Sequence, residues 1–572
     1  MKIARVAFAL SWGLVVASLA ACGDDDAAPS DAGTPDSGLD AASDDAGEDD
    51  GGPGDDGGQD AGPVDAGTTR SATITVIGRG VVTSDPAAID CGGTEPTAPH
   101  TPCSADLETG ATLTLHAAAA DAWRFTGWSG DCSGTTDATL TLDADRVCTA
   151  TFALATWTHV LDFGDSDTLD AVLEVPDALA WIVAGTSTRA GNDRIWLARV
   201  DTLGRLEWSR LVSFPSSANA GRRSLTPVTG GFAVVASLTA DVLIARFDFD
   251  GNPQTGAIAT STFVYDTGAL VLGEPVAAPA AGGGLLLAAD AERGPLLARL
   301  DAATLPTYMR GSDAFYPPRP VAVFDQPGGG FVLAAEARGA MGATGTLEIL
   351  SFAADESLVW GWRYGMTQRD FLRDAIRTSD GGYLLAGSID LGAPNGLDLL
   401  LVRIDADGAI VWQKAYGEAQ SQVARAVVER PGGAGFVVVG TTVTTGATGS
   451  IDAWVIGVTA DGTLEWQRRY GGDGTDQARA VTTSRSGGFF VAGRTTSTRA
   501  TGDGWLLRIA DDGSITGCPA GLTATTGATS TDTAITGLAD DLVRRSRTPI
   551  PIAVSPSLGV PLPGTTTECT GS

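Results

Sequence analysis

Lysine and histidine are nearly absent from this sequence of 572 residues. Lys2 and Lys414 are the only lysines, and the three histidines, His100, His116 and His159, are scattered. These side chains are among those most used for phosphate binding and acid–base chemistry. The sequence also has no G-x-S-x-G, H-E-x-x-H or P-loop motif, and no G-x-G-x-x-G at a strand-to-helix junction. We therefore expect no enzyme, no catalytic residue and no cofactor.

Motifs for metal ions are missing as well. The sequence has no C-x-x-C pair for zinc and no D-x-[DN]-x-[DN]-G loop with a downstream glutamate for calcium. We expect no metal site. Carboxylates are abundant, and a hydrolytic pair of them across a central channel stays open as an alternative, although no pair can be singled out.

Positive charge is scarce, because 37 Lys and Arg residues stand against 69 Asp and Glu residues, for a net charge of −32. Residues 23–69 hold fourteen Asp, one Glu and no Lys or Arg among mostly small residues. Such a segment buries too little apolar surface to fold, so residues 22–70 are predicted to be a disordered acidic tether. The tether carries −15 and residues 1–22 carry +2, which leaves −19 on residues 70–572. An acidic body argues against a nucleic-acid partner.

The N-terminus has the order of an export signal. Lys2 and Arg5 precede an apolar stretch from Val6 to Leu19, which is shorter than the ~20 residues that span a bilayer. The run Leu19-Ala-Ala-Cys22 resembles the bacterial lipobox, whose cysteine is acylated on sulfur after the signal is removed. The resemblance implies a lipoprotein signal peptide over residues 1–21 and a membrane anchor on Cys22.

Six cysteines remain besides Cys22, and an even number in an exported chain indicates disulfide bonds. Six cysteines allow fifteen pairings, and sequence alone does not select one. We favour local closure. The favoured pairs are Cys91 with Cys103, Cys132 with Cys148, and Cys518 with Cys569.

Residues 71–153 alternate apolar and polar side chains in short runs, which predicts a small β domain. Phe125-Thr-Gly-Trp-Ser-Gly-Asp-Cys132 and Ala144-Asp-Arg-Val-Cys-Thr-Ala-Thr-Phe152 resemble the divergent internalin-type B-repeat, also called the bacterial repeat domain. The resemblance implies a compact module of exported bacterial proteins, adhesive or a spacer. For Trp123, Phe125 and Trp128, core packing is favoured over a ligand-stacking platform.

A second pattern repeats after Phe152. Its anchoring tryptophans are Trp157, Trp208, Trp360, Trp412 and Trp466, at steps of 51, 152, 52 and 54 residues. The long step equals three steps of about 51, so the period continues where the tryptophan is lost. Glycines before an aromatic residue or leucine recur at the same period, and together the markers indicate seven copies within residues 154–517.

Each copy reads as four strands, which is typical of a β-propeller. In the sixth copy the expected strands are Ala424 to Glu429, Gly435 to Thr441, Asp452 to Thr459 and Thr463 to Tyr470. The seventh copy supplies only three strands, and Thr156 to Phe163 supplies a fourth before the first copy. We predict an all-β chain in which a small disulfide-bonded module precedes a seven-bladed propeller closed by its N-terminal strand. The weak middle copies leave six to eight blades open.

The repeats resemble those of bacterial cell-surface proteins with W-x3-[YF]-G motifs, as in Trp412-Gln-Lys-Ala-Tyr-Gly417. The spacing D-x2-G-x3-W, as from Asp405 to Trp412, predicts a tight turn before a strand whose tryptophan packs between blades. The loops between second and third strands, such as Thr186 to Asp193 and Thr441 to Asp452, are expected to be long and exposed. They are the first place to look for a binding face, but plain solvent-exposed connections are favoured.

The remaining tail, residues 518–572, lacks a clear repeat. Ala534 to Arg545 is a candidate short helix, and a disulfide from Cys518 to Cys569 would fasten the tail near the last blade.

These predictions describe a monomeric lipoprotein of the outer membrane, displayed at the cell surface, that acts as a binding, adhesion or structural module. Its lipid on Cys22 would hold the membrane, and its ligand would be an extracellular protein or glycan. The alternative is a periplasm-facing docking or assembly scaffold. A propeller that hydrolyses glycans is a third hypothesis.

Overall fold

The computed structural model describes most of the chain after residue 67. The described residues are 68–93, 100–163, 165–176, 178–189, 191–213, 219–237, 241–254, 262–266, 273–291, 294–301, 306–311, 319–337, 346–355, 357–365, 370–390, 396–417, 420–443, 450–516, 523–524, 529–532, 536–539, 551–553, 557–559 and 564–570. The expected signal peptide, the lipid site at Cys22 and nearly all of the tether lie outside them. Helix is limited, in the described ranges, to the single turns η1 (Ala281–Gly283) and η2 (Pro431–Gly433). Neither of these is long and apolar enough to cross a membrane.

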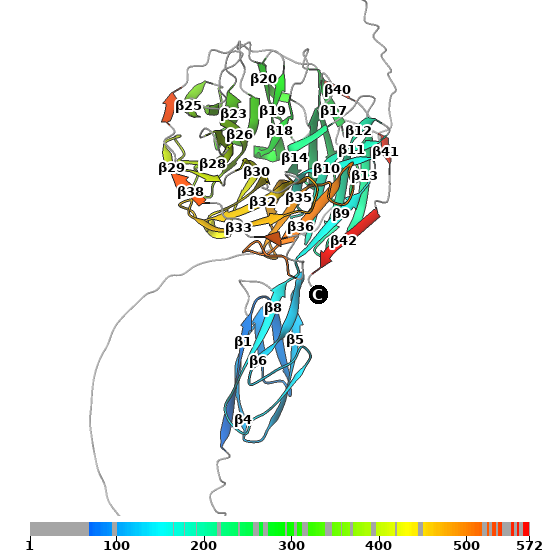
Figure 1. Ribbon diagram of the computed structural model, residues 1–572, viewed down its shortest axis with the longest axis vertical. Helices are drawn as coiled ribbons and strands as arrows, with labels where there is room; N and C mark the ends of the chain where they lie inside the picture. The colour runs from blue at the N-terminus through cyan, green and yellow to red at the C-terminus, as the bar shows by residue number, and fades with distance from the viewer. Residues whose placement is uncertain are drawn as a thin grey trace, which may run out of the picture. The chain divides into compact units, whose positions relative to one another are not determined.

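Residues 69–154 form a small domain of two four-stranded sheets (Figure 1). The first has the order β4-β1-β8-β6, with β1 (Thr69–Ile77), β4 (Ser104–Glu108), β6 (Trp123–Gly130) and β8 (Arg146–Leu154). The second has the order β3-β2-β5-β7, with β2 (Gly80–Asp85), β3 (Asp90–Gly93), β5 (Thr112–Ala119) and β7 (Ala138–Thr141). Alternate side chains of β5 face the core, where Leu113 and Leu115 are fully buried.

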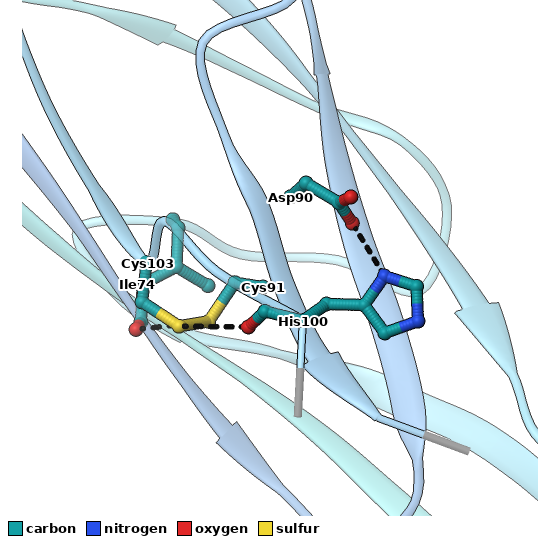
Figure 2. The surroundings of a disulfide bond; sticks show 5 residues. All are labelled: Ile74, Asp90, Cys91, His100 and Cys103. Carbon is teal, nitrogen blue, oxygen red and sulfur yellow. Dashed lines mark hydrogen bonds and ion pairs between the residues drawn. A yellow bond between two sulfur atoms is a disulfide. The ribbon is translucent and has the colours of Figure 1, made fainter. Parts of the chain in front are cut away.

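Two disulfide bonds hold this domain together. They join Cys91 to Cys103 and Cys132 to Cys148, as local closure predicts. Figure 2 shows the first of them beside Asp90, whose carboxylate lies 2.9 Å from Nδ1 of His100. A domain of this size buries only a small apolar core. The two disulfides stabilise it further, because they restrict the unfolded chain.

The aromatic side chains of the small domain belong mainly to its core. Trp128 is 7 % exposed, and its Nε1 donates to the carbonyl of Thr136 over 2.8 Å. Phe125 packs edge-on against Trp128 and lies 5.4 Å from Phe152 between ring centroids. Trp123 is partly buried, and its Nε1 donates to the carbonyl of Ser486 in the large domain. The structure therefore uses all three predicted residues for packing.

The large domain contains seven sheets, which we number 1 to 7 in sequence order. Sheet 1 consists of β10 (Ser166–Glu174), β11 (Ala180–Arg189), β12 (Asn192–Asp201) and β13 (Leu206–Ser213). Sheet 2 consists of β14 (Asn219–Val228), β15 (Gly231–Ser237), β16 (Asp241–Phe247) and β17 (Thr262–Asp266). Sheet 3 consists of β18 (Val276–Ala280), β19 (Gly284–Ala291), β20 (Gly294–Leu300) and β21 (Pro306–Gly311).

The later sheets repeat this meander of neighbouring antiparallel strands. Sheet 4 consists of β22 (Arg319–Asp325), β23 (Phe331–Ala337), β24 (Thr346–Phe352) and β25 (Leu358–Gly365). Sheet 5 consists of β26 (Asp370–Arg377), β27 (Tyr383–Asp390), β28 (Leu397–Ile404) and β29 (Ile410–Gly417). Sheet 6 consists of β30 (Gln422–Glu429), β31 (Phe436–Val443), β32 (Ile451–Val458) and β33 (Leu464–Tyr470). Sheet 7 consists of β34 (Asp476–Thr483), β35 (Phe489–Thr495), β36 (Asp503–Ile509) and β9 (Trp157–Asp162).

The first strands of the sheets contact one another in order. β10 contacts β14, and the contacts continue through β18, β22, β26 and β30 to β34, which contacts β10. Figure 1 shows β10, β14, β18, β26 and β30 towards the middle of the large domain, and the fourth strands β13, β25, β29 and β33 towards its outside. The core between sheets is apolar, because the second and third strands are hydrophobic on both faces and are buried between neighbours.

The strand before the first copy completes the last sheet. β9 pairs antiparallel with β36, in a register that places Trp157 opposite Arg508 and Leu161 opposite Gly504. The predicted pairing of Thr156 to Phe163 with the seventh copy is therefore confirmed. The pairing joins two segments almost 350 residues apart, so it also covers the strand edge that β36 would otherwise expose.

The C-terminal tail adds a fifth strand to six of the sheets. The tail strands are β37 (Thr523–Ala524), β38 (Thr529–Asp532), β39 (Thr536–Ala539), β40 (Pro551–Ala553), β41 (Ser557–Gly559) and β42 (Gly564–Thr570). They extend sheets 6, 5, 4, 2, 1 and 7 in that order. The short helix predicted from Ala534 to Arg545 is wrong in part, since Thr536–Ala539 pairs with β25 as a strand. Cys518 lies outside the described residues, so its pairing with Cys569 stays a prediction.

Candidate functional site

Tryptophans of the fourth strands join neighbouring sheets. Nε1 of Trp208 in sheet 1 donates to the carbonyl of Phe249 in sheet 2 over 3.0 Å. Nε1 of Trp412 in sheet 5 donates to Ala460 in sheet 6 over 2.9 Å. Each acceptor carbonyl belongs to the turn immediately after the third strand of the neighbouring sheet.

The same contact connects sheet 7 to sheet 1. Nε1 of Trp157 on β9 donates to the carbonyl of Thr202 over 2.9 Å, and Trp157 is 2 % exposed. Its ring also lies against Gly204, where an added Cβ would be 3.0 Å from the indole. The boundary between the last and first sheets is therefore built like the boundaries between consecutive sheets.

A turn glycine receives each of these rings. Gly462 has a φ of +78°, and a Cβ there would lie 2.9 Å from the ring of Trp412. Asp405, at the start of the corresponding turn of sheet 5, accepts hydrogen bonds from the amides of Asp407 and Ala409. The D-x2-G-x3-W spacing thus encodes a tight turn and a tryptophan that packs between sheets, as predicted.

Two of the predicted tryptophan anchors differ in detail. At the boundary of sheets 4 and 5, Trp362 rather than Trp360 donates to the turn, through Nε1 to the carbonyl of Asp407 over 2.9 Å. Trp360 is partly buried against the core of sheets 4 and 5. Trp466 lies against Gly513, with 2.6 Å from an added Cβ to its ring, but no partner for its Nε1 is found in the described residues.

Tyrosines strengthen the same boundaries. The hydroxyl of Tyr416 donates to the carbonyl of Gly462 over 2.6 Å, and the hydroxyl of Tyr470 donates to Gly513. Burial raises the pKa of Tyr470 well above its usual range, because the phenolate would lose its hydration. Trp412 and Tyr416 therefore supply two bonds to one turn of the next sheet, whereas at Trp466 and Tyr470 only the tyrosine bond is found among the described residues.

Carboxylates gather where sheet 7 meets sheet 1. Asp162 ends β9, Asp167 lies near the start of β10, and Asp503 begins β36; one oxygen of each lies within 4.8 Å of the others. Such a set of oxygen atoms can coordinate a hard cation in principle. Arg499 already pairs with Asp162, and its Nε lies 3.7 Å from Oδ1 of Asp503. The guanidinium group of Arg499 therefore already lies between two of these carboxylates, Asp162 and Asp503.

A related pair lies between sheets 6 and 7. Asp476 accepts hydrogen bonds from the amide of Gly472 and the hydroxyl of Ser497. Asp452 pairs with Nε of Arg469 at 3.2 Å, yet burial and the charge of Asp476 raise the pKa of Asp452 to about 6. These carboxylates were not singled out from sequence, although Trp157, Trp360 and Trp466 are each followed by an aspartate ten residues later.

The histidines do not converge in the structure. His100 and His116 each lie 2.9 Å from an aspartate on the surface of the small domain. His159 packs edge-on against Trp157 in the large domain, and burial lowers its pKa. One of the loops expected to be long, Thr186 to Asp193, is short, because β11 continues to Arg189 and β12 begins at Asn192.

Comparison with known proteins identifies one part of the chain. A model of the divergent InlB B-repeat domain matches residues 92–156. No curated protein sequence matches the chain. Similar solved structures include a protein of unknown function from Bacteroides caccae, 12 % identical, covering 54 % of this chain and 93 % of that chain with a TM-score of 0.29. Another is Drosophila Semaphorin 2a, 8 % identical, covering 64 % and 79 % with a TM-score of 0.38.

Drosophila Plexin A, in complex with Semaphorin 1b, is similarly distant. It is 9 % identical and covers 62 % of this chain and 85 % of that chain, with a TM-score of 0.33. Likenesses at this level give no information about function, so the functional proposal depends on the residues of this chain.

Proposed function

We propose that this chain is a lipid-anchored binding protein of the outer membrane, displayed at the cell surface, whose large domain is a seven-bladed β-propeller. The observation that carries the proposal is the contact of Trp157 with the turn at Thr202 and Gly204. It repeats, between the last and first sheets, the contact that joins consecutive sheets. A ring closed in this way is a rigid scaffold that holds its connecting loops in fixed positions, which suits recognition.

Contacts across the ring also support this architecture. Nε of Arg223, on the first strand of sheet 2, lies 2.6 Å from Oδ1 of Asp374, on the first strand of sheet 5. The other oxygen of Asp374 accepts a hydrogen bond from the amide of Val427 in sheet 6. First strands from distant copies therefore meet at one place, as the first strands of a propeller do around its axis.

Anchoring and display are proposed from the sequence and the disulfides. The lipobox-like run that ends at Cys22 would place a lipid at the start of the acidic tether. The two disulfides of the small domain suit an oxidising compartment outside the cytoplasm. Binding is favoured over catalysis because the clustered carboxylates already have partners within the protein. Asp162 pairs with Arg499, Asp167 accepts a hydrogen bond from a backbone amide, and Asp476 accepts one from a hydroxyl group.

A localisation experiment tests this proposal. Cys22→Ser should move the protein from the membrane fraction to the soluble fraction, whereas Cys91→Ser should leave the lipid anchor unaffected. Protease added to intact cells should remove the folded body of the unaltered protein. Unchanged membrane fractionation of Cys22→Ser would contradict the anchor, and protection from protease would favour a periplasm-facing docking scaffold. Hydrolysis of a glycan by the purified protein would contradict a purely binding role.

A further inference from the structure

The first strands of five sheets carry a β-bulge at the same position. The register shifts between Leu169 and Ala171 in β10, between Pro320 and Ala322 in β22, between Leu372 and Asp374 in β26, between Ala424 and Ala426 in β30, and between Ala478 and Ala480 in β34. A bulge leaves one residue outside the ladder and redirects its side chain.

Arginine occupies the bulge in three of these strands. The bulged residue of β22 is Val321, which follows no anchoring tryptophan. The other bulged residues lie thirteen residues after Trp157, Trp360, Trp412 and Trp466, and they are Asp170, Arg373, Arg425 and Arg479. The three arginines are half-buried, while the residues on either side of each are buried. The repeat therefore directs a guanidinium group, at a fixed position, from the innermost strand of successive sheets.

Three arginines line one recess among the first strands. Its charged lining consists of Arg223 from sheet 2, Arg319 from sheet 4, Arg373 and Asp374 from sheet 5, and Glu274 from the segment before β18. Its apolar lining consists of Val276, Pro320 and Val321. The recess has an empty volume of about 280 Å³, part of which is open solvent. The centre of a water molecule can occupy only about 10 Å³ of it, so a single chemical group, rather than a whole sugar or peptide, would enter the recess.

The charge of this lining is opposite to the charge of the molecule. Three arginines face two carboxylates in the recess, whereas the whole chain has 69 acidic residues against 37 basic ones. Arg223 is held in place by Asp374 and by the carbonyl of Ala375. Nη1 of Arg319 lies 3.8 Å from Glu336, beyond hydrogen-bonding distance.

We propose that the recess binds an anionic group with at least two oxygen atoms, a carboxylate or a phosphate, between Arg319 and Arg373. The planar guanidinium fork donates two parallel hydrogen bonds to such a group, which lysine cannot do. Arg223, fixed by Asp374, adds positive charge at the wall of the recess. Glu274 weakens binding, because its carboxylate opposes an incoming anion. The inference names a ligand class for the binding function proposed above and rests on that function.

Calorimetric titration of the purified full-length protein tests the site. The probes are inorganic phosphate and tricarballylate, each at constant ionic strength with chloride as the reference anion. We expect saturable binding of at least one probe, and binding by one alone identifies the phosphate or the carboxylate as the ligand group. Arg373→Gln should weaken that binding at least tenfold. Arg205→Gln is the matched control, because Arg205 is 74 % exposed in a turn of sheet 1 and should leave affinity unchanged.

A second variant acts in the opposite direction and does not depend on losing an arginine. Glu274→Gln should raise the affinity for the same probe several-fold, since it removes negative charge from the recess. Absence of saturable binding for both probes would overturn the proposal. Equal affinities of Arg373→Gln and Arg205→Gln would also overturn it, as would weaker binding in Glu274→Gln. None of these outcomes depends on Cys22, so failure of the anion site can be distinguished from failure of the membrane anchor.

Discussion

The large domain contains two arcs whose sheets are joined differently. In the anchored arc, sheets 4 to 7 and sheets 1 and 2, each boundary has a tryptophan of one sheet against a turn of the next. In the middle arc, the boundaries of sheet 3 with sheets 2 and 4 lack this contact among the described residues. The core between sheets 2 and 3 consists of alanine, valine, leucine and isoleucine alone.

In the middle arc, an ion pair joins sheets 3 and 4 at the turn between the first and second strands of sheet 4. Nη2 of Arg299 in sheet 3 lies 2.7 Å from Oδ1 of Asp325 in sheet 4 and also donates to the carbonyls of Gly329 and Gly330. Aliphatic packing therefore joins sheets 2 and 3, and an arginine adds polar contacts between sheets 3 and 4. The sheet, rather than the tryptophan, is the repeating unit, and the tryptophan adds a directional bond to a contact that is already apolar.

The largest effect on stability is expected from removing the tryptophan contact that joins sheet 7 to sheet 1 in the anchored arc. Trp157→Ala removes a ring that is 2 % exposed and its hydrogen bond to Thr202, so it should lower the free energy of unfolding by about 3–5 kcal/mol. Chemical denaturation followed by near-ultraviolet circular dichroism measures the change. Val411→Ala is the control, because Val411 is 60 % exposed and should cost less than about 0.5 kcal/mol. Equal costs for the two variants would contradict a structural role for the closing contact.

Two kinds of turn differ in what their glycines touch: Gly462 lies between a third and a fourth strand, whereas Gly282 lies between a first and a second strand. Gly462 and Gly282 have similar φ values of +78° and +74°, but only Gly462 faces a ring, since no atom lies within 4 Å of a Cβ added at Gly282. Gly282→Ala should therefore cost about 1 kcal/mol, from the left-handed backbone alone. Gly462→Ala should cost about 2–3 kcal/mol, because it also displaces Trp412. Thermal unfolding of the pair measures the difference, and identical melting temperatures would show that the ring moves freely.

The sequence predicts the anchored arc well and the middle arc poorly, for a physical reason. Trp412, Tyr416 and Gly462 must each keep one residue type to make their contacts, so their spacing stays visible in the chain. The boundary of sheets 2 and 3 needs only apolar volume, which Ala233 or Leu287 supplies without a motif. The strands of sheet 6 begin and end within two residues of their predicted limits.

The candidate sites are harder to predict, because they depend on groups from several copies. Asp162, Asp167 and Asp503 belong to the two ends of the large domain and meet only after β9 joins β36. The arginines of the recess come from sheets 2, 4 and 5, and only Arg373 follows the tryptophan period. A search for residues at fixed distances from each tryptophan would have found Arg373, Arg425 and Arg479.

A smaller effect is expected from removing one hydroxyl group in the anchored arc. Tyr470→Phe keeps the ring and deletes the bond from the hydroxyl to the buried carbonyl of Gly513. The variant should lower the free energy of unfolding by about 1–2 kcal/mol, since the carbonyl is left without that donor. Urea denaturation measures the change. A cost equal to that of Trp157→Ala would contradict the distinction between the ring contact and its added hydrogen bond.

The smallest net effect, with a characteristic pH dependence, is expected at Asp452 between sheets 6 and 7. Its pKa is raised to about 6, so the folded state holds the proton more tightly than the unfolded state, and its contribution to stability falls as pH rises from about 4 to 6. Asp452→Asn removes this decline and should stabilise the protein at pH 7. The net gain should be only about 1 kcal/mol, because the loss of the ion pair with Arg469 offsets part of it. The gain should vanish by pH 4.

The control for this variant is Asp355 in sheet 4, whose pKa is shifted in the opposite direction. Hydrogen bonds from Ser357 lower the pKa of Asp355, so its contribution to stability is present above pH 4 and is lost as the carboxylate is protonated. Asp355→Asn should therefore destabilise the protein at pH 7 relative to low pH. Urea denaturation at pH 4, 5, 6 and 7 separates the two variants. Parallel pH profiles would show that burial between the sheets does not set the charge of Asp452, and that the boundary of sheets 6 and 7 tolerates a buried carboxylate at no cost.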